Sequence, residues 1–112
     1  DIPVPGSHTI IGDRAYGKTP AEVIRLARRM SDGLLSGGVL PVLKHIPGHG
    51  RARVDSHDDL PIVEASLEEL EASDFVPFKA LADIPLGMTA HIVYTALDKD
   101  RPATTSPTAI AY

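Results

Sequence analysis

The sequence predicts an α/β fold in which helices alternate with short strands of a parallel sheet. Two apolar runs, residues 39–43 and 86–90, are short and continuous enough to be buried strands, and segments with helix-capping signals lie around them. This alternation is typical of βα units. A closed TIM-type (β/α)8 barrel needs roughly 200–250 residues. The 112 residues are therefore expected to be a fragment of such a barrel, roughly its middle βα units.

The first helix is expected to begin at Thr19. Residues 1–18 are rich in Pro and Gly and have no helical period, so they are expected to form loop or strand-edge structure. Thr19 can cap the helix, Pro20 suits its first turn, and Glu22 completes a capping box. Apolar residues then recur at spacings of three and four, at Val23, Leu26, Ala27, Met30 and Leu34. Gly37-Gly38 should end the helix.

Each of the two expected strands is followed by a histidine. Residues 39–43 (VLPVL) come directly after the first helix and suit a strand buried on both faces, although Pro41 cannot donate to a sheet. Residues 86–90 (LGMTA) form the second run. Ligands of parallel α/β sheets bind beyond the carboxyl ends of the strands, where the sequence places His45 and His91.

Three shorter helical segments are expected in the second half of the chain. A capping box at Ser66–Glu69 opens the first of them. Residues 74–82 should form another turn or two, with inward-facing Phe75, Phe78 and Leu81. Ser106-Pro107 is typical of an N-cap followed by a first-turn proline, so a last helix should begin there.

The composition excludes several classes of function. Hydrophobic residues make up 43% and charged residues 23%, as in ordinary globular proteins, and the net charge of -4 argues against nucleic acid as a partner. The one basic cluster, Arg25, Arg28 and Arg29, is interpreted as a solvated helix face. The absence of cysteine excludes disulfides and cysteine-ligated zinc. No apolar run approaches the ~20 residues of a membrane-spanning helix, so no membrane partner is expected.

Residues 44–57 (KHIPGHGRARVDSH) contain three of the five histidines. The spacing of His45 and His49 would allow both to bind zinc on one helical turn, but Pro47-Gly48 disfavours a helix there. Asp55 and His57 remain conceivable further ligands, which leaves a metal-dependent hydrolase as one alternative. No metal and no cofactor is predicted.

Proton transfer is a second interpretation of the same segment. A carboxylate bonded to one ring nitrogen of histidine fixes the tautomer and raises basicity, and Asp55 and His57 share a face of an extended stretch. Ser56 is not expected to be a nucleophile and should bond local backbone instead. The alternative is a solvated loop whose histidine has no role. At the strand end, Lys44-His45 could hydrogen-bond the oxygens of a ligand, or Lys44 could simply reach solvent.

The motifs of this segment resemble those of the family 3 glycoside hydrolases, in particular the bacterial cytoplasmic β-N-acetylglucosaminidases. KHIPGHG followed by DSH is similar to the family signature K-H-[FI]-P-G-H-G, a few variable residues, then D-[ST]-H. IGDRAYG (residues 11–17) resembles the family's G-x-R-[SA]-[FY]-G, and MTAHIVYTALD (88–98) its strand-end segment before P-A-T-x-S (102–106). The resemblance covers nearly the whole chain, in order.

The resemblance implies a role for five residues in a retaining exo-β-N-acetylglucosaminidase. His57 would be the general acid/base and Asp55 its dyad partner, while Lys44, His45 and Arg14 would hold the sugar. An aspartate nucleophile would form a covalent glycosyl-enzyme. The substrate would be an N-acetylglucosamine-containing saccharide, and the enzyme would release N-acetylglucosamine from anhydro-muropeptides during peptidoglycan recycling in the bacterial cytoplasm. In this interpretation residues 47–50 (PGHG) form a flexible hinge, and His49 has no role.

The resemblance breaks off before the nucleophile, which the family carries on a later strand. None of the aspartates at positions 74, 83, 98 and 100 has the family's nucleophile context. Residues 1–112 are therefore expected to be a partial catalytic barrel domain, lacking its N-terminal and C-terminal parts and inactive alone. A non-catalytic carbohydrate-binding remnant that keeps Arg14, Lys44 and His45 is a further alternative.

Overall fold

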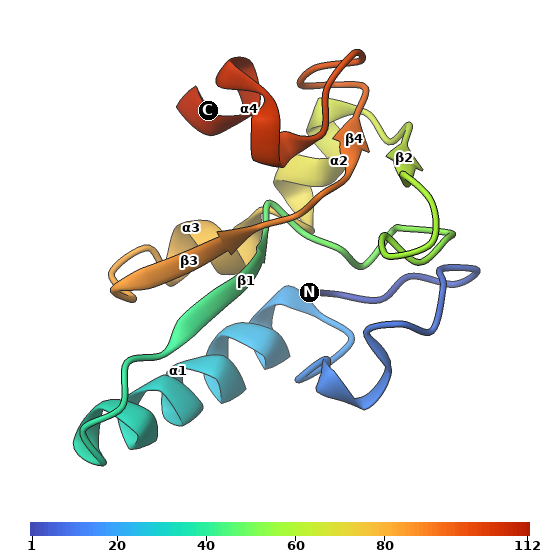
Figure 1. The fold of residues 1–112 in the computed structure, drawn as a ribbon. Helices are drawn as coiled ribbons and strands as arrows, with labels where there is room; N and C mark the ends of the chain where they lie inside the picture. Colours follow the sequence, from blue (N-terminus) through green and yellow to red (C-terminus); the bar gives the residue numbers. More distant parts are fainter.

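The computed structural model describes all of residues 1–112, and its elements alternate between helices and parallel strands (Figure 1). Strand β1 (Val42–Ile46) pairs in parallel with β3 (Leu86–Thr89). Farther along the chain, β2 (Ile62–Val63) pairs in parallel with β4 (Val93–Tyr94). These parallel pairs confirm the predicted α/β fold, although neither β2 nor β4 was predicted from the sequence. No helix has the length and apolar character that would let it cross a membrane.

Helix α1 (Pro20–Ser36) begins where the capping signals predicted. The Thr19 side chain accepts the backbone N–H of Glu22 at 3.3 Å. The Glu22 carboxylate, however, accepts the backbone N–H of Lys18 at 3.1 Å, so the expected reciprocal capping box is displaced by one residue. Of the expected apolar stripe, Val23 and Ala27 are buried.

The end of α1 explains why the first strand was predicted too early. Gly38 has a φ of 79°, and Val39 donates its backbone N–H back to the Leu34 carbonyl at 2.9 Å, as in a Schellman motif. Val39 therefore belongs to the helix cap. Pro41 has no N–H for a ladder, so β1 begins only at Val42 and extends through Lys44 and His45. The prediction of a strand over 39–43, with Lys44-His45 beyond its end, was wrong.

The prediction that the strands are buried on both faces was also wrong. Val42, Leu86 and Met88 are 45%, 44% and 49% exposed. Each of the two sheets contains only two strands, so one edge of every strand lacks a neighbour. Side chains on the faces of the β1–β3 pair remain in contact with solvent, whereas Val63, Val93 and Tyr94 of the β2–β4 pair are buried.

The remaining helices agree with the capping signals. Ser66 and Glu69 form the predicted capping box at α2 (Leu67–Ala72), and the Ser106 side chain caps α4 (Pro107–Ala111). Helix α3 (Val76–Ala80) lies within the predicted range. Two 3-10 helices were not predicted, η1 (Gly12–Arg14) and η2 (Ala103–Thr105).

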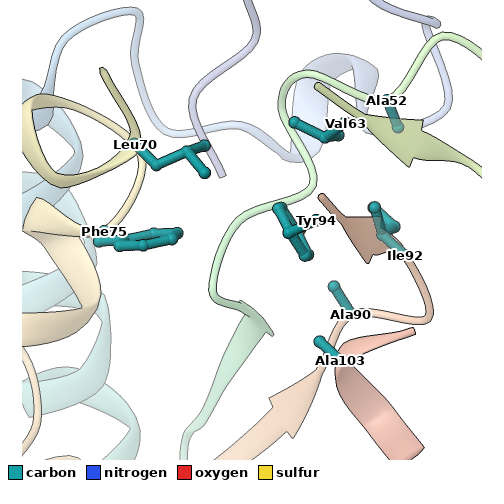
Figure 2. Close-up of a cluster of buried hydrophobic side chains, with 8 residues drawn as sticks. All are labelled: Ala52, Val63, Leu70, Phe75, Ala90, Ile92, Tyr94 and Ala103. Atoms are coloured by element: carbon teal, nitrogen blue, oxygen red, sulfur yellow. The ribbon is translucent and has the colours of Figure 1, made fainter. Parts of the chain in front are cut away.

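The hydrophobic core lies beside the β2–β4 pair (Figure 2). Leu70 and Phe75 enter it from α2 and the turn before α3, facing Tyr94 of β4. Its other members are Ala52, Val63, Ala90, Ile92 and Ala103. Phe75, Phe78 and Leu81 are all buried, which confirms their predicted inward orientation.

The basic cluster on α1 is not uniformly solvated. Arg28 forms a bidentate ion pair with Asp83 at 2.7 and 2.5 Å, which ties α1 to the segment after α3. Both side chains are substantially exposed, so the pair contributes little to stability.

Candidate active site

Arg14, Lys44 and His45, the three residues expected to hold a sugar, line one cavity of about 340 Å³ between α1, β1 and the N-terminal segment. This volume lies within the range of about 300–1,000 Å³ that small-molecule sites occupy. Residues of α1 and α3 form its apolar wall. Asp55 and His57 are not among the lining residues, so the expected proton-transfer pair lies outside this cavity.

A break in the strand register lets neighbouring residues of β1 reach the same cavity. Lys44 pairs with Met88 and Ile46 with Thr89, so His45 is left without a partner in the ladder. Such a bulge changes the direction of a side chain. The peptide bonds Lys44–His45 and Ile46–Pro47 are both cis. Strand-end geometry was the expected reason for the two side chains to converge, and the structure replaces it with a bulge inside the strand.

Arg14 reaches the cavity from η1, and its guanidinium is held by main-chain carbonyls. Its Nη2 donates to Ile10 O at 2.6 Å and its Nε donates to Ile11 O at 3.3 Å. Gly12, at the start of η1, has a φ of 52°, which a residue with a side chain adopts with difficulty. The tight turn thus holds the positive charge of Arg14 beside the cavity.

Asp1 fixes the position of His45 and was not singled out from the sequence. Its carboxylate, 5% exposed, accepts the backbone N–H groups of His45 at 3.1 Å and of His49 at 2.7 Å. The other carboxylate oxygen lies 2.8 Å from His45 Nδ1. No local pattern could reveal this contact, because 44 residues separate the partners.

The environment of His45 favours a neutral ring. Burial lowers the pKa of His45 to about 4, and the positive charges of Lys44 and Arg14 act in the same direction. The Asp1 carboxylate opposes this shift because it favours the charged form. Since a carboxylate only accepts, Nδ1 carries the hydrogen, and Nε2 of the neutral ring can accept a hydrogen bond from a hydroxyl group.

Residues 47–52, which we call the platform, are packed rather than flexible. Gly48, His49, Gly50 and Ala52 are buried, and the Tyr94 hydroxyl donates to the Gly48 carbonyl. Val4 donates its backbone N–H to Gly50 O at 3.1 Å. The interpretation of PGHG as a hinge is therefore wrong.

An ion pair anchors the far end of the platform. Arg51 Nε donates to the 4%-exposed Asp74 carboxylate at 2.8 Å, and Arg51 Nη2 donates to Ser73 Oγ at 3.2 Å. Asp74 is thereby committed to a structural contact. Two other aspartates are committed in the same way, since Asp83 pairs with Arg28 and Asp98 accepts from Ser106 Oγ at 2.6 Å.

Asp55 and His57 are in contact in a turn that follows the platform. Asp55 Oδ1 accepts the backbone N–H of His57 at 2.9 Å and lies 2.7 Å from its Nδ1. The two residues meet through this Asx-type turn and not along an extended stretch as expected. The hydrogen bonds from the His57 backbone and ring lower the pKa of Asp55. Asp55 therefore stays ionised and can hold Nδ1–H, which leaves Nε2 of the 80%-exposed His57 ring free.

Two further histidines differ from expectation. His49 lies inside the platform with Nε2 3.1 Å from Ser56 Oγ, so Ser56 bonds a side chain instead of local backbone. His91 is exposed and does not line the cavity at β1. No group of three or more His, Asp or Glu side chains is arranged to hold a metal ion.

Comparison with known proteins places this arrangement in context. Residues 4–111 match the Glycosyl hydrolase family 3 N terminal domain. A protein from Tolumonas auensis named beta-hexosaminidase is 46% identical over 99 residues, covering 84% of this chain and 29% of that protein.

Two solved structures are similar to the whole fold. A glycoside hydrolase family 3 beta-N-acetylglucosaminidase from Paenibacillus sp. has a TM-score of 0.90 and 36% identity, covering 97% of this chain and 21% of that one. NagZ from Neisseria gonorrhoeae, in complex with N-trifluoroacetyl-D-glucosamine, has a TM-score of 0.84 and 40% identity, covering 92% of this chain and 30% of that one. The chain thus spans less than a third of the length of these proteins. These similarities confirm the predicted fold class, an α/β segment of a TIM-type (β/α)8 barrel.

Proposed function

The chain belongs to glycoside hydrolase family 3, and from that membership we propose that residues 1–112 are a partial catalytic barrel domain of a retaining exo-β-N-acetylglucosaminidase. Its substrate is a terminal β-linked N-acetylglucosamine on peptidoglycan (anhydro-muropeptide) fragments. Support comes from relatives named beta-hexosaminidase and from the glucosamine derivative bound to NagZ of N. gonorrhoeae.

The Asp55–His57 pair is the observation that carries this proposal. His57 is the general acid/base: it protonates the glycosidic oxygen as the bond breaks and later removes a proton from the attacking water. Asp55 holds Nδ1–H at 2.7 Å, which directs Nε2 outward and stabilises the charged ring. Most glycosidases use a second carboxylic acid here, whereas histidine titrates near neutral pH without a large shift.

The cavity at β1 binds the sugar. Lys44 and Arg14 donate hydrogen bonds to sugar oxygens, and neutral His45 accepts one through Nε2. An aspartate nucleophile lies outside residues 1–112, and the segment alone should not hydrolyse 4-nitrophenyl N-acetylglucosaminide. Measurable turnover by the segment would overturn that part of the proposal.

Leaving-group dependence in the full-length protein tests the role of His57. His57→Ala should slow an alkyl N-acetylglucosaminide about 10²–10⁴-fold, because its leaving group needs a proton. A 2,4-dinitrophenyl glycoside, which leaves unprotonated, should lose far less. Asp55→Ala should give the same pattern in a milder form, and exposed His91→Ala serves as the matched control. Equal losses for both substrates would contradict the acid/base role.

Other outcomes would favour the two alternatives. Stoichiometric zinc with metal-dependent activity would favour a metal-dependent hydrolase that uses the His/Asp residues. Encoding sequence that stops at Tyr112, together with sugar binding, would favour a carbohydrate-binding remnant. We also propose a cytoplasmic location in a bacterium, which cell fractionation can test.

A further inference from the structure

His49 is buried yet polar, and neither the sequence nor the proposed mechanism gives it a role. The residue is 5% exposed, and its Nδ1 has no hydrogen-bond partner. An unpaired nitrogen in the interior is unfavourable, so an apolar side chain would suit a purely structural position better. The polar edge that the ring does use is Nε2, 3.1 Å from Ser56 Oγ.

This contact is the one hydrogen bond between residues 53–60, which we call the exposed loop, and the rest of the protein. The other hydrogen bonds of the exposed loop are local, such as those from the Asp58 and Asp59 N–H groups to Asp55 O, both at 3.0 Å. Ser56 stands between Asp55 and His57. This hydrogen bond is therefore the one that links the segment carrying the acid/base pair to the platform.

The His49 ring also contacts the ring of His45, which lines the cavity. The rings of His45 and His49 meet edge to face, with centroids 5.3 Å apart and an angle of 62° between their planes. Asp1 holds the backbone N–H groups of both histidines. The platform thus fixes His49 in a place where one imidazole contacts both a sugar-holding residue and the exposed loop.

We propose that His49 is a positioning residue that docks the exposed loop through Ser56 and so sets the place of His57 relative to the sugar cavity. This inference rests on the proposed function, because docking matters to a reaction only if His57 transfers a proton. The hydroxyl of Ser56 and a nitrogen of His49 are both required. Threonine at position 56 retains the hydroxyl.

Hydrogen exchange tests docking without any assay of activity. In the full-length protein, Ser56→Ala and His49→Phe should each speed amide exchange in residues 53–60, whereas Ser56→Thr should not. Phenylalanine keeps a ring in the buried position, which limits damage to the fold. Ser36→Ala is the matched control, because Ser36 Oγ bonds only the Asp32 carbonyl at the exposed end of α1. Unchanged exchange in Ser56→Ala would overturn the proposal.

Kinetics then test the link to proton transfer. Ser56→Ala should lower kcat for the alkyl glycoside about three- to tenfold, the effect expected of one hydrogen bond, and leave the 2,4-dinitrophenyl glycoside nearly unchanged. Adding His49→Phe should cause little further loss, because both changes remove one contact. Equal losses of kcat for the two substrates, or a Ser56→Thr variant as defective as Ser56→Ala, would also overturn the proposal that His49 docks the exposed loop. If the parent protein hydrolyses no N-acetylglucosaminide, the proposed function fails, and the exchange experiment still decides whether His49 docks the loop.

Discussion

Replacing Gly50 with alanine should separate the N-terminal segment from the platform. A methyl group on Gly50 would overlap the carbonyl carbon and oxygen of Ile2, and even the Ile2 nitrogen would lie 3.0 Å away. All of these atoms belong to the backbone, and Ile2 is itself buried, at 6% exposed. No rotation of a side chain can relieve the overlap, so the two backbone segments must move apart.

The cost of that movement has two sources. Overpacking a buried position costs about 1–3 kcal/mol. Separation also breaks the hydrogen bond from Val4 N–H to Gly50 O and weakens the one from His49 N–H to Asp1, each contributing about 1 kcal/mol. The free energy of unfolding should therefore fall by about 2–5 kcal/mol.

Gly33→Ala supplies the matched control for this substitution. Gly33 lies inside α1, and a methyl group there would meet no atom within 4 Å. Alanine should stabilise the helix by about 0.5–1 kcal/mol. Thermal and urea unfolding of the full-length variants, followed by circular dichroism, measures both effects. The packing argument is refuted if Gly50→Ala is as stable as Gly33→Ala.

Two further predictions concern the charged groups around the platform. Arg51→Met leaves the buried Asp74 carboxylate without its ion-pair partner and should lower the free energy of unfolding by about 3 kcal/mol. Lys79→Met, at an exposed pair, should lower it by less than about 1 kcal/mol. Similar losses for the two variants in urea unfolding would contradict this expectation. The Asp55 carboxyl, followed by NMR, should titrate below its ordinary pKa of 3.8, so any stabilisation from its ionised form is present above that pH and is lost as the pH falls through the lower folded value. In His57→Ala the pKa of Asp55 should rise, because the hydrogen bond from the ring is lost, but it should stay below 3.8, because the backbone N–H of residue 57 lowers this pKa more than the ring does and remains. An unchanged titration midpoint of Asp55 would show that the ring hydrogen bond does not form.

The helices could be predicted because their signals are local. Thr19, Ser66 and Ser106 each cap a helix with a side chain that reaches three residues along the chain. The strands were predicted less well, because an apolar run does not reveal where hydrogen bonding starts. Within residues 39–43, Val39 belongs to the helix cap, and Pro41 has no N–H to donate. The strand therefore covers Val42–Ile46 instead.

The site shows the same limit. The Asp55–His57 contact spans two residues and was predicted from their spacing, although the turn that creates it was not. Asp1 lies 44 residues from His45, and Arg51 lies 23 residues from Asp74, so only the folded chain brings these charges together. A buried polar histidine such as His49 has no local sequence signal that separates it from an exposed one.

The glycines of PGHG gain a different meaning from this packing. At Gly50 the missing side chain allows Ile2 to approach the platform, and that approach brings the Asp1 carboxylate to His45 and His49. The motif therefore joins the N-terminal segment to β1 instead of allowing movement between them. Any freedom of the acid/base pair must then come from the exposed loop beyond Ala52, where Ser56 provides the single hydrogen bond to the platform. A change in the platform should consequently disturb sugar binding and proton transfer together, whereas a change at Ser56 should disturb proton transfer alone.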